Sequence, residues 1–503
     1  MPDAAARLAP KSIAKTLFII DPDRDERASQ LFMEALLTIA QNGYVAPAGD
    51  PTSPKVRRFA IRSLVLGNNF LQGQTGQVGG GAMTMQEYGQ NLADARDFQG
   101  ADNLALARTA LESLIDPSTQ QGQKGQHLLL PFHESLLWYD ARQAGPTYTA
   151  RKVRMRGSGL TFARMVLDPP DAAGADARRN AQGCLAGLRD ALRERGPLAE
   201  IANGLEGVLP DLATASPPLE DDERQAWELG ASTDLAPFAA QFCRHANGVT
   251  AQGGASAPAR LWQLRAALGL DMAVHSLRRA WGATGAPARH RYVLLAMPGP
   301  DRQGDRVRLR SEKSYADARA SLRWATIETL AARMRELGAE PGIDWAAEFE
   351  PRTSRLLRDA VITPLGIAGR TDHRALAQLA FEAANYDRSG EGFRVLLDSI
   401  GVTAGGSRYR YLSASPDLMA ALVGALSAEM PLPSSQFFRR IAQEWGLVIS
   451  ADAAIGTTFG DELDGPDLVN NARRFERLMI DAGLAADLSD RTVMVGERAM
   501  ARA

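Results

Sequence analysis

A basic residue at every second position is the pattern in this chain whose residue types and spacing could do chemistry. It occurs at Arg306, Arg308 and Arg310, with Val307 and Leu309 between them. A strand sends alternate side chains to opposite faces, so this spacing predicts a strand whose three guanidinium groups share one face. Guanidinium groups bind phosphate oxygens in bidentate fashion. The pattern therefore predicts a site for a repeating anion such as a nucleic-acid backbone.

The same alternation occurs once more, at Lys152, Arg154 and Arg156. From residue 277 to residue 335 there are 13 basic and 5 acidic residues, a local balance of +8, whereas the whole chain carries −2. A basic stripe on an otherwise mildly acidic protein attracts polyanions locally. Two alternatives stay open: a solvated edge strand whose charges prevent aggregation, and ion pairs with the acidic remainder of the chain.

The N-terminal segment supplies the enzyme hypothesis. Residues 17–20 are apolar and predict a short strand, and Asp21 and Asp23 follow it directly. Carboxylates at the end of a strand are the ligands that hold Mg²⁺ in some phosphotransfer folds. Acidic residues ahead of a helix are also favourable because of the helix dipole. The pair is therefore a candidate metal site with a structural alternative.

Other catalytic and cofactor motifs are missing from the sequence. The glycine-rich segment 73–81 has no lysine in the position that a phosphate-binding P-loop requires. Cys243 and His245 have no second pair to complete a zinc site, and no H-E-x-x-H spacing occurs. We therefore expect no cofactor and no bound metal, and we recognise no catalytic constellation.

The bulk composition is that of a soluble globular protein, with 45% hydrophobic and 23% charged residues. Cys184 and Cys243 lie in sequence contexts typical of helix interiors, which suits a reducing compartment. The sequence contains neither a secretory signal nor an apolar segment long enough to span a membrane. These features predict a cytoplasmic location, and the abundance of alanine and arginine suggests a bacterial source.

Hydrophobic periodicity predicts a mainly α protein of several domains with a few short strands. We expect an N-terminal domain with a basic strand at 1–168, a helical domain at 169–285, a central basic strand plus helices at 286–405, and a winged-helix-like domain at 406–503. Predicted helices span 53–66, 101–115, 127–139, 175–195, 235–246, 258–281, 314–337, 352–361, 373–385 and 393–400.

The order of elements is most informative after residue 415. Helices are predicted to begin at Ser415, to run over 435–445, and to run over 467–482, before two short strands at 484–488 and 492–495. Three helices followed by a hairpin is the order of a winged helix. The third helix carries Arg473, Arg474 and Arg477, which could dock into a nucleic-acid groove. Near-neutral winged helices can bind proteins instead, so that alternative stays open.

The same part of the chain, from Tyr411 to Glu497, is similar to the C-terminal part of uncharacterised proteins encoded in bacterial antiviral defence operons. The resemblance rests on Leu412, on the apolar run 418–426, and on the motifs Phe437-Phe438, Trp445-Gly446-Leu447 and Gly483-Leu484. It implies a defence or DNA-handling context. It contains no catalytic motif and so assigns no role to any residue.

These observations support one main hypothesis and two alternatives. The main hypothesis is a non-catalytic subunit of a bacterial multi-protein system, such as an antiviral defence system, with other proteins as partners and no membrane contact. It would bind nucleic acid or another polyanion through Lys152, Arg154, Arg156, Arg306, Arg308, Arg310, Arg473, Arg474 and Arg477. The alternatives are a metal-dependent phosphate-ester enzyme that uses Asp21 and Asp23, and a protein–protein scaffold whose basic strands pair with acidic surfaces.

Overall fold

The computed structural model divides into two compact units. The first unit comprises residues 28–268, and the second comprises residues 1–27 together with 269–503. The structure describes residues 8–19, 27–47, 56–58, 77–78, 83–84, 109, 132–134, 137, 139–144, 147–150, 157–193, 195–208, 219–297, 299, 305–338, 373–383, 389–406, 409–427, 430–488 and 492–496. Most of these residues are helical, which confirms the predicted mainly α class.

Helices dominate the described part of the first unit. They are α2 (Ala28–Gln41), α6 (Ser158–Leu167), α7 (Gly174–Leu192), α8 (Pro197–Val208), α9 (Asp221–Gly230), α10 (Ala236–Thr250) and the beginning of α11 (Ala257–Ala283). In a small sheet, β1 (Val56–Arg58) runs parallel to β4 (Tyr139–Ala144), and β4 pairs antiparallel with β5 (Thr147–Ala150). A separate hairpin joins β2 (Gln77–Val78) and β3 (Met83–Thr84).

The centre of the first unit is the close packing of α7 on α10. A Cβ atom at Gly183 would lie 2.2 Å from Asn247 Oδ1, and one at Gly187 would lie 2.7 Å from Thr250 Cβ. Because real Cβ atoms do not approach so closely, a larger residue at Gly187 would shift α7 against α10, whereas one at Gly183 would displace the end of the Asn247 side chain. Cys184 lies between the two glycines in the interior of α7, as the sequence context predicted, and it is buried.

A buried carboxylate holds α2 to the start of α6. Glu34 is 1% exposed, and its two oxygens accept hydrogen bonds from the backbone nitrogens of Gly157 at 3.0 Å and Gly159 at 2.8 Å. These nitrogens lie at a helix N-terminus, where donors are otherwise unsatisfied and negative charge is favourable. Glu34 therefore has a structural role.

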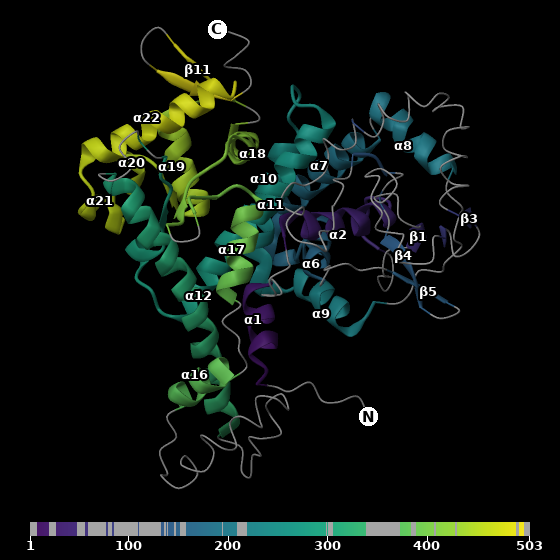
Figure 1. The fold of residues 1–503 in the computed structure, drawn as a ribbon, viewed down its shortest axis with the longest axis horizontal. Helices are drawn as coiled ribbons and strands as arrows, with labels where there is room; N and C mark the ends of the chain where they lie inside the picture. Colours follow the sequence, from purple (N-terminus) through teal and green to yellow (C-terminus); the bar gives the residue numbers. More distant parts are fainter. Residues whose placement is uncertain are drawn as a thin grey trace. The chain divides into compact units, whose positions relative to one another are not determined.

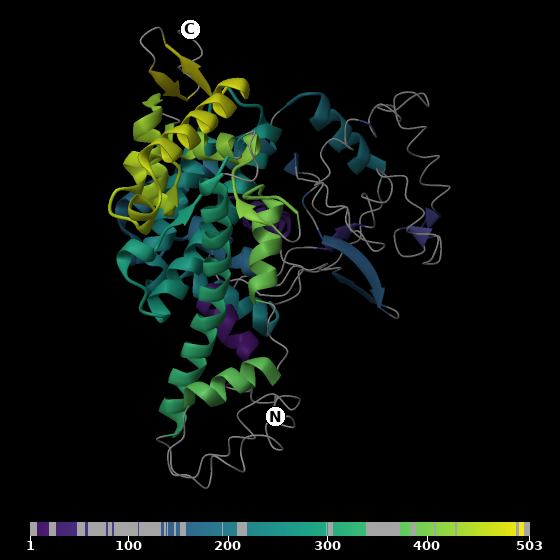
Figure 2. The ribbon, with the colours of Figure 1, turned by 60° about the vertical axis from the view of Figure 1, so that its left-hand side comes forward.

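The second unit is built around one long helix, α12 (Arg306–Gly338), which Figures 1 and 2 show in contact with elements from distant parts of the chain. Helices α1 (Pro10–Phe18), α16 (His373–Ala383) and α17 (Ser389–Ser399) pack along it. Short strands β6 (Val293–Leu294) and β8 (Tyr411–Leu412) contact it as well, and β8 pairs with β7 (Thr403–Ala404).

Two serines on α12 form hydrogen bonds with backbone groups at β6 and β8, which belong to two-stranded sheets. Ser311 Oγ lies 2.7 Å from the carbonyl oxygen of Leu294 and accepts a hydrogen bond from the Leu412 nitrogen at 3.0 Å. Ser314 Oγ accepts from the Leu294 nitrogen at 3.2 Å. Buried backbone groups must find partners, and here helix side chains replace a missing strand. This explains why a helix can lie directly on the ends of β6 and β8.

The last part of the second unit has helices and strands in alternation. It contains α18 (Pro416–Ser427), β9 (Leu432–Pro433), α19 (Ser434–Trp445), β10 (Leu447–Val448), α20 (Ala451–Ala454), α21 (Thr458–Glu462), α22 (Gly465–Asp481), β11 (Ala485–Asp487) and β12 (Val493–Val495). Strand β12 lies between β11 and β9 and is antiparallel to both, whereas β10 pairs in parallel with β6.

Many predicted elements agree with the described residues. Predicted helices at 175–195, 235–246, 258–281, 373–385 and 393–400 correspond to α7, α10, α11, α16 and α17. The three helices and two strands predicted after residue 415 correspond to α18, α19, α22, β11 and β12. Predicted helices at 101–115 and 352–361 lie almost entirely outside the described residues.

Three predicted elements are wrong, in addition to the strand at 306–310, which is described with the candidate site. In place of the strand predicted at 17–20, residues 17–18 end α1, whose Ile13 and Leu17 are buried one helical turn apart, and Ile19 caps the helix with a φ of 69°. Residues 56–58, within a predicted helix, form β1 because β4 supplies a pairing partner that local sequence does not reveal. Likewise, Tyr139, at the end of the predicted helix 127–139, begins β4.

Candidate functional site

The segment with alternating arginines is the beginning of α12 and not a strand, which corrects the first prediction from the sequence. Asp305 precedes the helix, and its side chain is 7% exposed. Its Oδ1 accepts from the Arg308 nitrogen at 3.0 Å, as an N-cap does, and its Oδ2 accepts from the Gly299 nitrogen at 3.0 Å. The first i to i−4 hydrogen bond runs from the Leu309 nitrogen to the Asp305 carbonyl oxygen. The aspartate three residues before Arg308 was the signal that sequence reasoning missed.

The helical geometry separates the three arginines that a strand would have aligned. Successive residues in an α-helix turn by about 100°, so Arg306 and Arg310 lie near each other on one face and Arg308 points away. Val307 is buried, whereas Leu309 is 47% exposed, so the two intervening residues do not share an inward face either. The beginning of α12 therefore presents no continuous row of three cations.

Each of these arginines is paired with carboxylates of the same unit. Arg306 forms an ion pair with Asp464 and lies 3.6 Å from Asp467. Arg310 pairs with Glu462, and Arg308 pairs with Glu312 one turn further along α12. The basic residues at the start of α12 therefore form ion pairs with the acidic segment 461–467 and with Glu312 in the next turn of α12. These pairs correspond to the alternative in which the arginines pair with acidic residues of the same chain. The outward-facing cationic surface that the alternating pattern predicted at 306–310 is therefore wrong.

The three arginines of α22 do not share one environment. Arg474 points inward, where its Nη1 donates to the Met297 carbonyl oxygen at 2.9 Å and to Asp305 Oδ2 at 3.2 Å. Arg473 and Arg477 are exposed and lie four residues apart, so they project from the same outward face of the helix. Asn470 is exposed one turn before Arg473. We call Asn470, Arg473 and Arg477 the outer face of α22.

The opposite side of α22 is anchored by one buried asparagine. Asn471 is fully buried, and its Oδ1 accepts from the Met297 nitrogen at 2.9 Å. Its Nδ2 donates to the carbonyl oxygens of Leu295 and Ile449, each at 2.9 Å. These two carbonyls directly follow β6 and β10, so one side chain joins the ends of both paired strands to α22. The anchor fixes which residues of α22 face outward.

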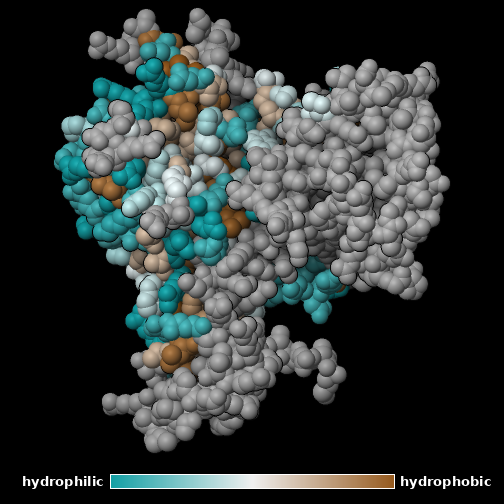
Figure 3. All heavy atoms as spheres, viewed as in Figure 1, coloured by the Kyte–Doolittle hydropathy of each residue, from teal (hydrophilic) through white to brown (hydrophobic). Residues whose placement is uncertain are grey.

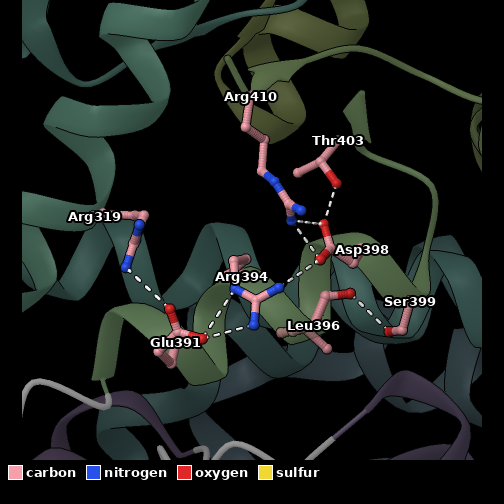
Figure 4. A network of polar contacts seen from close by, with 8 residues as sticks. All are labelled: Arg319, Glu391, Arg394, Leu396, Asp398, Ser399, Thr403 and Arg410. Atoms are coloured by element: carbon pink, nitrogen blue, oxygen red, sulfur yellow. Dashed lines mark hydrogen bonds and ion pairs between the residues drawn. The ribbon is translucent and has the colours of Figure 1, made fainter. Parts of the chain in front are cut away.

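A network of charged side chains links α12, α17 and the β7–β8 hairpin (Figure 4). Asp398 accepts hydrogen bonds from Arg394 at 3.2 Å and from Arg410 and Thr403. The Glu391 carboxylate forms an ion pair with Arg394 at 2.6 Å and lies 3.6 Å from the Arg319 guanidinium group. Because each carboxylate has basic partners on more than one element, the network acts as a brace between elements and contains no nucleophile poised for reaction.

Tyr315 lies beside this network, and its hydroxyl is buried with no hydrogen-bond partner among the described residues. Burial raises the pKa of Tyr315, while the nearby guanidinium groups of Arg319 and Arg410 act in the opposite direction. The neutral phenol is therefore the form present at physiological pH. It can donate a hydrogen bond but does not act as a base.

The remaining predicted site residues lie outside the part of the chain that the structure describes. They are Lys152, Arg154, Arg156, Asp21 and Asp23. Among the residues that are described, no group of three or more histidine, cysteine, aspartate or glutamate side chains is arranged to hold a metal ion. Over the same residues, no helix is long and apolar enough to cross a membrane.

Comparisons with known proteins return no relative: no protein-family model, no curated protein and no solved structure matches this chain.

Proposed function

We propose that residues 416–496 form a winged helix. The support is the order of elements, α18–β9–α19–α22–β11–β12, in which the hairpin of β11 and β12 follows the third main helix. Strand β9, between the first two helices, pairs with β12 to complete a three-stranded sheet. Strand β10 and the short helices α20 and α21 are inserted between α19 and α22.

We further propose that the chain is a non-catalytic binding protein that contacts nucleic acid through the outer face of α22. The observation that carries this proposal is the exposure of Asn470, Arg473 and Arg477 at helical spacing on the third helix of the module. In helix-turn-helix proteins the corresponding helix enters the major groove. Arginine can bind phosphates or guanine edges there, and asparagine can bind adenine. The resemblance of 411–497 to defence-operon proteins suggests that the chain acts as a subunit of a bacterial multi-protein system.

The direct experiment measures binding of duplex and single-stranded DNA and RNA by fluorescence anisotropy at two salt concentrations. The double variant Arg473→Ser with Arg477→Ser should weaken binding about tenfold or more and reduce the salt slope by about 0.9 for each phosphate that is no longer neutralised. The matched control is Arg178→Ser with Arg179→Ser, which removes the same charge from exposed positions of α7. Equal affinity of the two double variants would refute the proposal.

A protein-binding role is the second candidate, and the charge of the module favours it. Residues 416–496 contain six arginines and twelve acidic residues, a net charge of −6, which opposes approach to DNA. Hydrophobic side chains are also exposed near α22, with Val469 40%, Ile480 36% and Leu488 38% exposed. Figure 3 shows hydrophobic surface gathered over the α22–β11 region. Exposed apolar groups beside arginine are typical of protein interfaces.

One mixing experiment separates the two roles. If the outer face of α22 binds nucleic acid, the anisotropy signal should fall as salt rises, because counterions are released on binding. If it binds protein, the wild-type chain should show no salt-dependent nucleic-acid binding, and Val469→Ser with Ile480→Ser should reduce capture of its partner subunit. Salt-dependent nucleic-acid binding by the wild type, together with unchanged capture of the partner subunit by that apolar double variant, would exclude the protein-binding role for this face.

A further inference from the structure

A small cavity in the second unit has walls suited to a flat ring. Its volume is roughly 200 Å³, and it lies between the end of α11, the segment that leads into β6, one face of α12 and the start of α21. Trp281, Tyr292 and Phe459 contribute aromatic surface to its lining. A water molecule occupies about 30 Å³ of liquid, so the cavity has room for one bicyclic ring but not for a folded peptide.

A guanidinium group with an unmet hydrogen bond forms part of the wall. Arg310 stacks over Phe459, with Cζ 4.8 Å from the ring centroid, and its Nε donates to Glu462. Its Nη1 is buried and has no hydrogen-bond partner among the described residues. A buried donor without an acceptor is unfavourable. Arg310 is therefore fixed by Phe459 and Glu462 but has one N–H donor that a ligand could satisfy.

A carboxylate stands next to that donor. Asp317 Oδ2 lies 4.0 Å from Arg310 Nη1, too far for a hydrogen bond, and the Asp317 side chain is 62% exposed. The two groups therefore offer an acceptor and a donor side by side. An isolated phosphate or carboxylate would meet the repulsion of Asp317, whereas a ligand edge with an acceptor beside its own N–H donors would satisfy both groups.

We propose that this cavity binds a guanine base. The guanine O6 would accept from Arg310, and the adjacent N1–H and N2–H groups would donate to the two oxygens of Asp317. Guanine is the nucleobase that presents two donors beside one acceptor on this edge, and its bicyclic ring suits the aromatic lining. Bases outside the double-helical stack are commonly held in this way, by edge hydrogen bonds and aromatic contact.

A neighbouring hollow has room for the sugar and phosphate of a nucleotide. It has a volume of roughly 810 Å³ and shares Asp317 and Ser321 with the guanine cavity. Trp324 and Arg374 line it, and the Arg374 guanidinium lies 5.2 Å over the Trp324 ring while it pairs with Glu328 at 2.6 Å. Asp317 and Glu328 also line this hollow, so a phosphate there would depend on its contact with Arg374. The ligand class is a guanine nucleotide, free or within a single strand.

The first test is calorimetric titration of the full chain with GMP, AMP, CMP and UMP. GMP is expected to bind at least tenfold more tightly than the other three. Equal affinity for all four nucleotides, or no binding of GMP, would overturn the proposal. This result is independent of the outer face of α22, because the Arg473→Ser with Arg477→Ser variant should bind GMP as the wild type does.

The second test assigns the contacts. Asp317→Asn keeps the size of the side chain but replaces one acceptor oxygen by a donor, so GMP affinity should fall at least tenfold while AMP affinity is unchanged. Asp461→Asn is the matched control, since Asp461 is exposed and lies outside the cavity lining. Unchanged GMP affinity in Asp317→Asn would refute the assignment even if the wild type binds GMP.

The third test identifies the source of the base. A short single-stranded oligonucleotide with one central guanine is compared with GMP, both against wild type and against Arg374→Ala. If a nucleic-acid strand is the ligand, the oligonucleotide binds more tightly than GMP. If a free nucleotide is the ligand, GMP binds more tightly, and Arg374→Ala weakens GMP more than guanosine. Each order supports a guanine site when Asp317→Asn weakens the tighter ligand, whereas insensitivity of both ligands to Asp317→Asn contradicts it.

Discussion

The arginines at the start of α12 and those on the outer face of α22 have the same chemistry but opposite environments. At the start of α12, Arg306 is held by Asp464 and Arg308 by Glu312. On α22, Arg473 and Arg477 are exposed on the side opposite to the buried Asn471. The contrast shows that the regular spacing of cations does not by itself define a binding surface. What decides is whether carboxylates, from the same helix or from elsewhere in the fold, pair with them.

The largest effect is expected when Asn471, on the buried side of α22, is replaced and compared with its exposed neighbour Asn470. Asn471→Ala removes hydrogen bonds to three backbone groups and should lower the free energy of unfolding by about 3 kcal/mol, since buried groups left unpaired cost about 1–3 kcal/mol each. Asn470→Ala, on the exposed side, should change it by less than about 0.5 kcal/mol. Urea unfolding of both variants measures the difference. Similar losses for the two would mean that the faces of α22 are wrongly assigned.

A buried histidine makes the stability of the second unit depend on pH. His275 in α11 is buried, and desolvation, aided by Arg279 and Arg278, lowers its pKa to about 3. Below pH 6.5 the unfolded chain binds a proton that the folded chain rejects, so stability should fall as the pH drops, by about 2 kcal/mol at pH 5. In His275→Gln this part of the fall should vanish. His290→Gln, at an exposed position, is the control, and an unchanged profile in His275→Gln would contradict the assignment.

A smaller effect is expected at the start of α12. Arg306→Ser with Arg308→Ser breaks ion pairs that are partly exposed, which should cost about 1 kcal/mol or less at low salt. Removing positive charge from a helix N-terminus offsets part of that loss. Nucleic-acid affinity and its salt slope should stay as in the wild type, in contrast to Arg473→Ser with Arg477→Ser. A tenfold loss of nucleic-acid affinity in the α12 variant would show that the start of α12 is a binding surface after all.

The smallest effect is expected at the cysteines, which should not react at all in the folded chain. Burial raises the pKa of the Cys184 thiol to about 12, and burial also raises the pKa of Cys243. The thiolate is the reactive form, so iodoacetamide at pH 8 should modify neither residue until the first unit unfolds. Mass spectrometry before and after addition of urea tests this. Modification without urea would show that α7 and α10 separate under native conditions.

The sequence was most informative where local signals and tertiary structure agree. The segment after residue 415 has clear helix starts and a short turn before its final strands, and α18, α19, α22, β11 and β12 lie where those signals predict. Strand β9 was not foreseen, because two residues, Leu432 and Pro433, contain no periodicity. Its pairing with β12 supplies the information that local sequence lacks.

The candidate site was harder to predict for a related reason. The residues 306–310 alternate between basic and apolar, which favours a strand, but Asp305 and the partners of Ser311 and Ser314 stabilise a helix. The carboxylates that pair with Arg306 and Arg310 are more than 150 positions away in the chain. No local pattern could reveal that pairing. By contrast, the outward projection of Arg473 and Arg477 follows from their spacing of four on a predicted helix.

The attachment of Asn471 to both β6 and β10 has a consequence for recognition. A helix held by three hydrogen bonds at its centre cannot roll about its axis without breaking them, so Arg473 and Arg477 keep a fixed orientation before any ligand arrives. The entropy of positioning this helix is lost during folding and not during association. Preorganisation of this kind favours slow dissociation of the ligand that fits and rejection of ligands that would require the helix to turn.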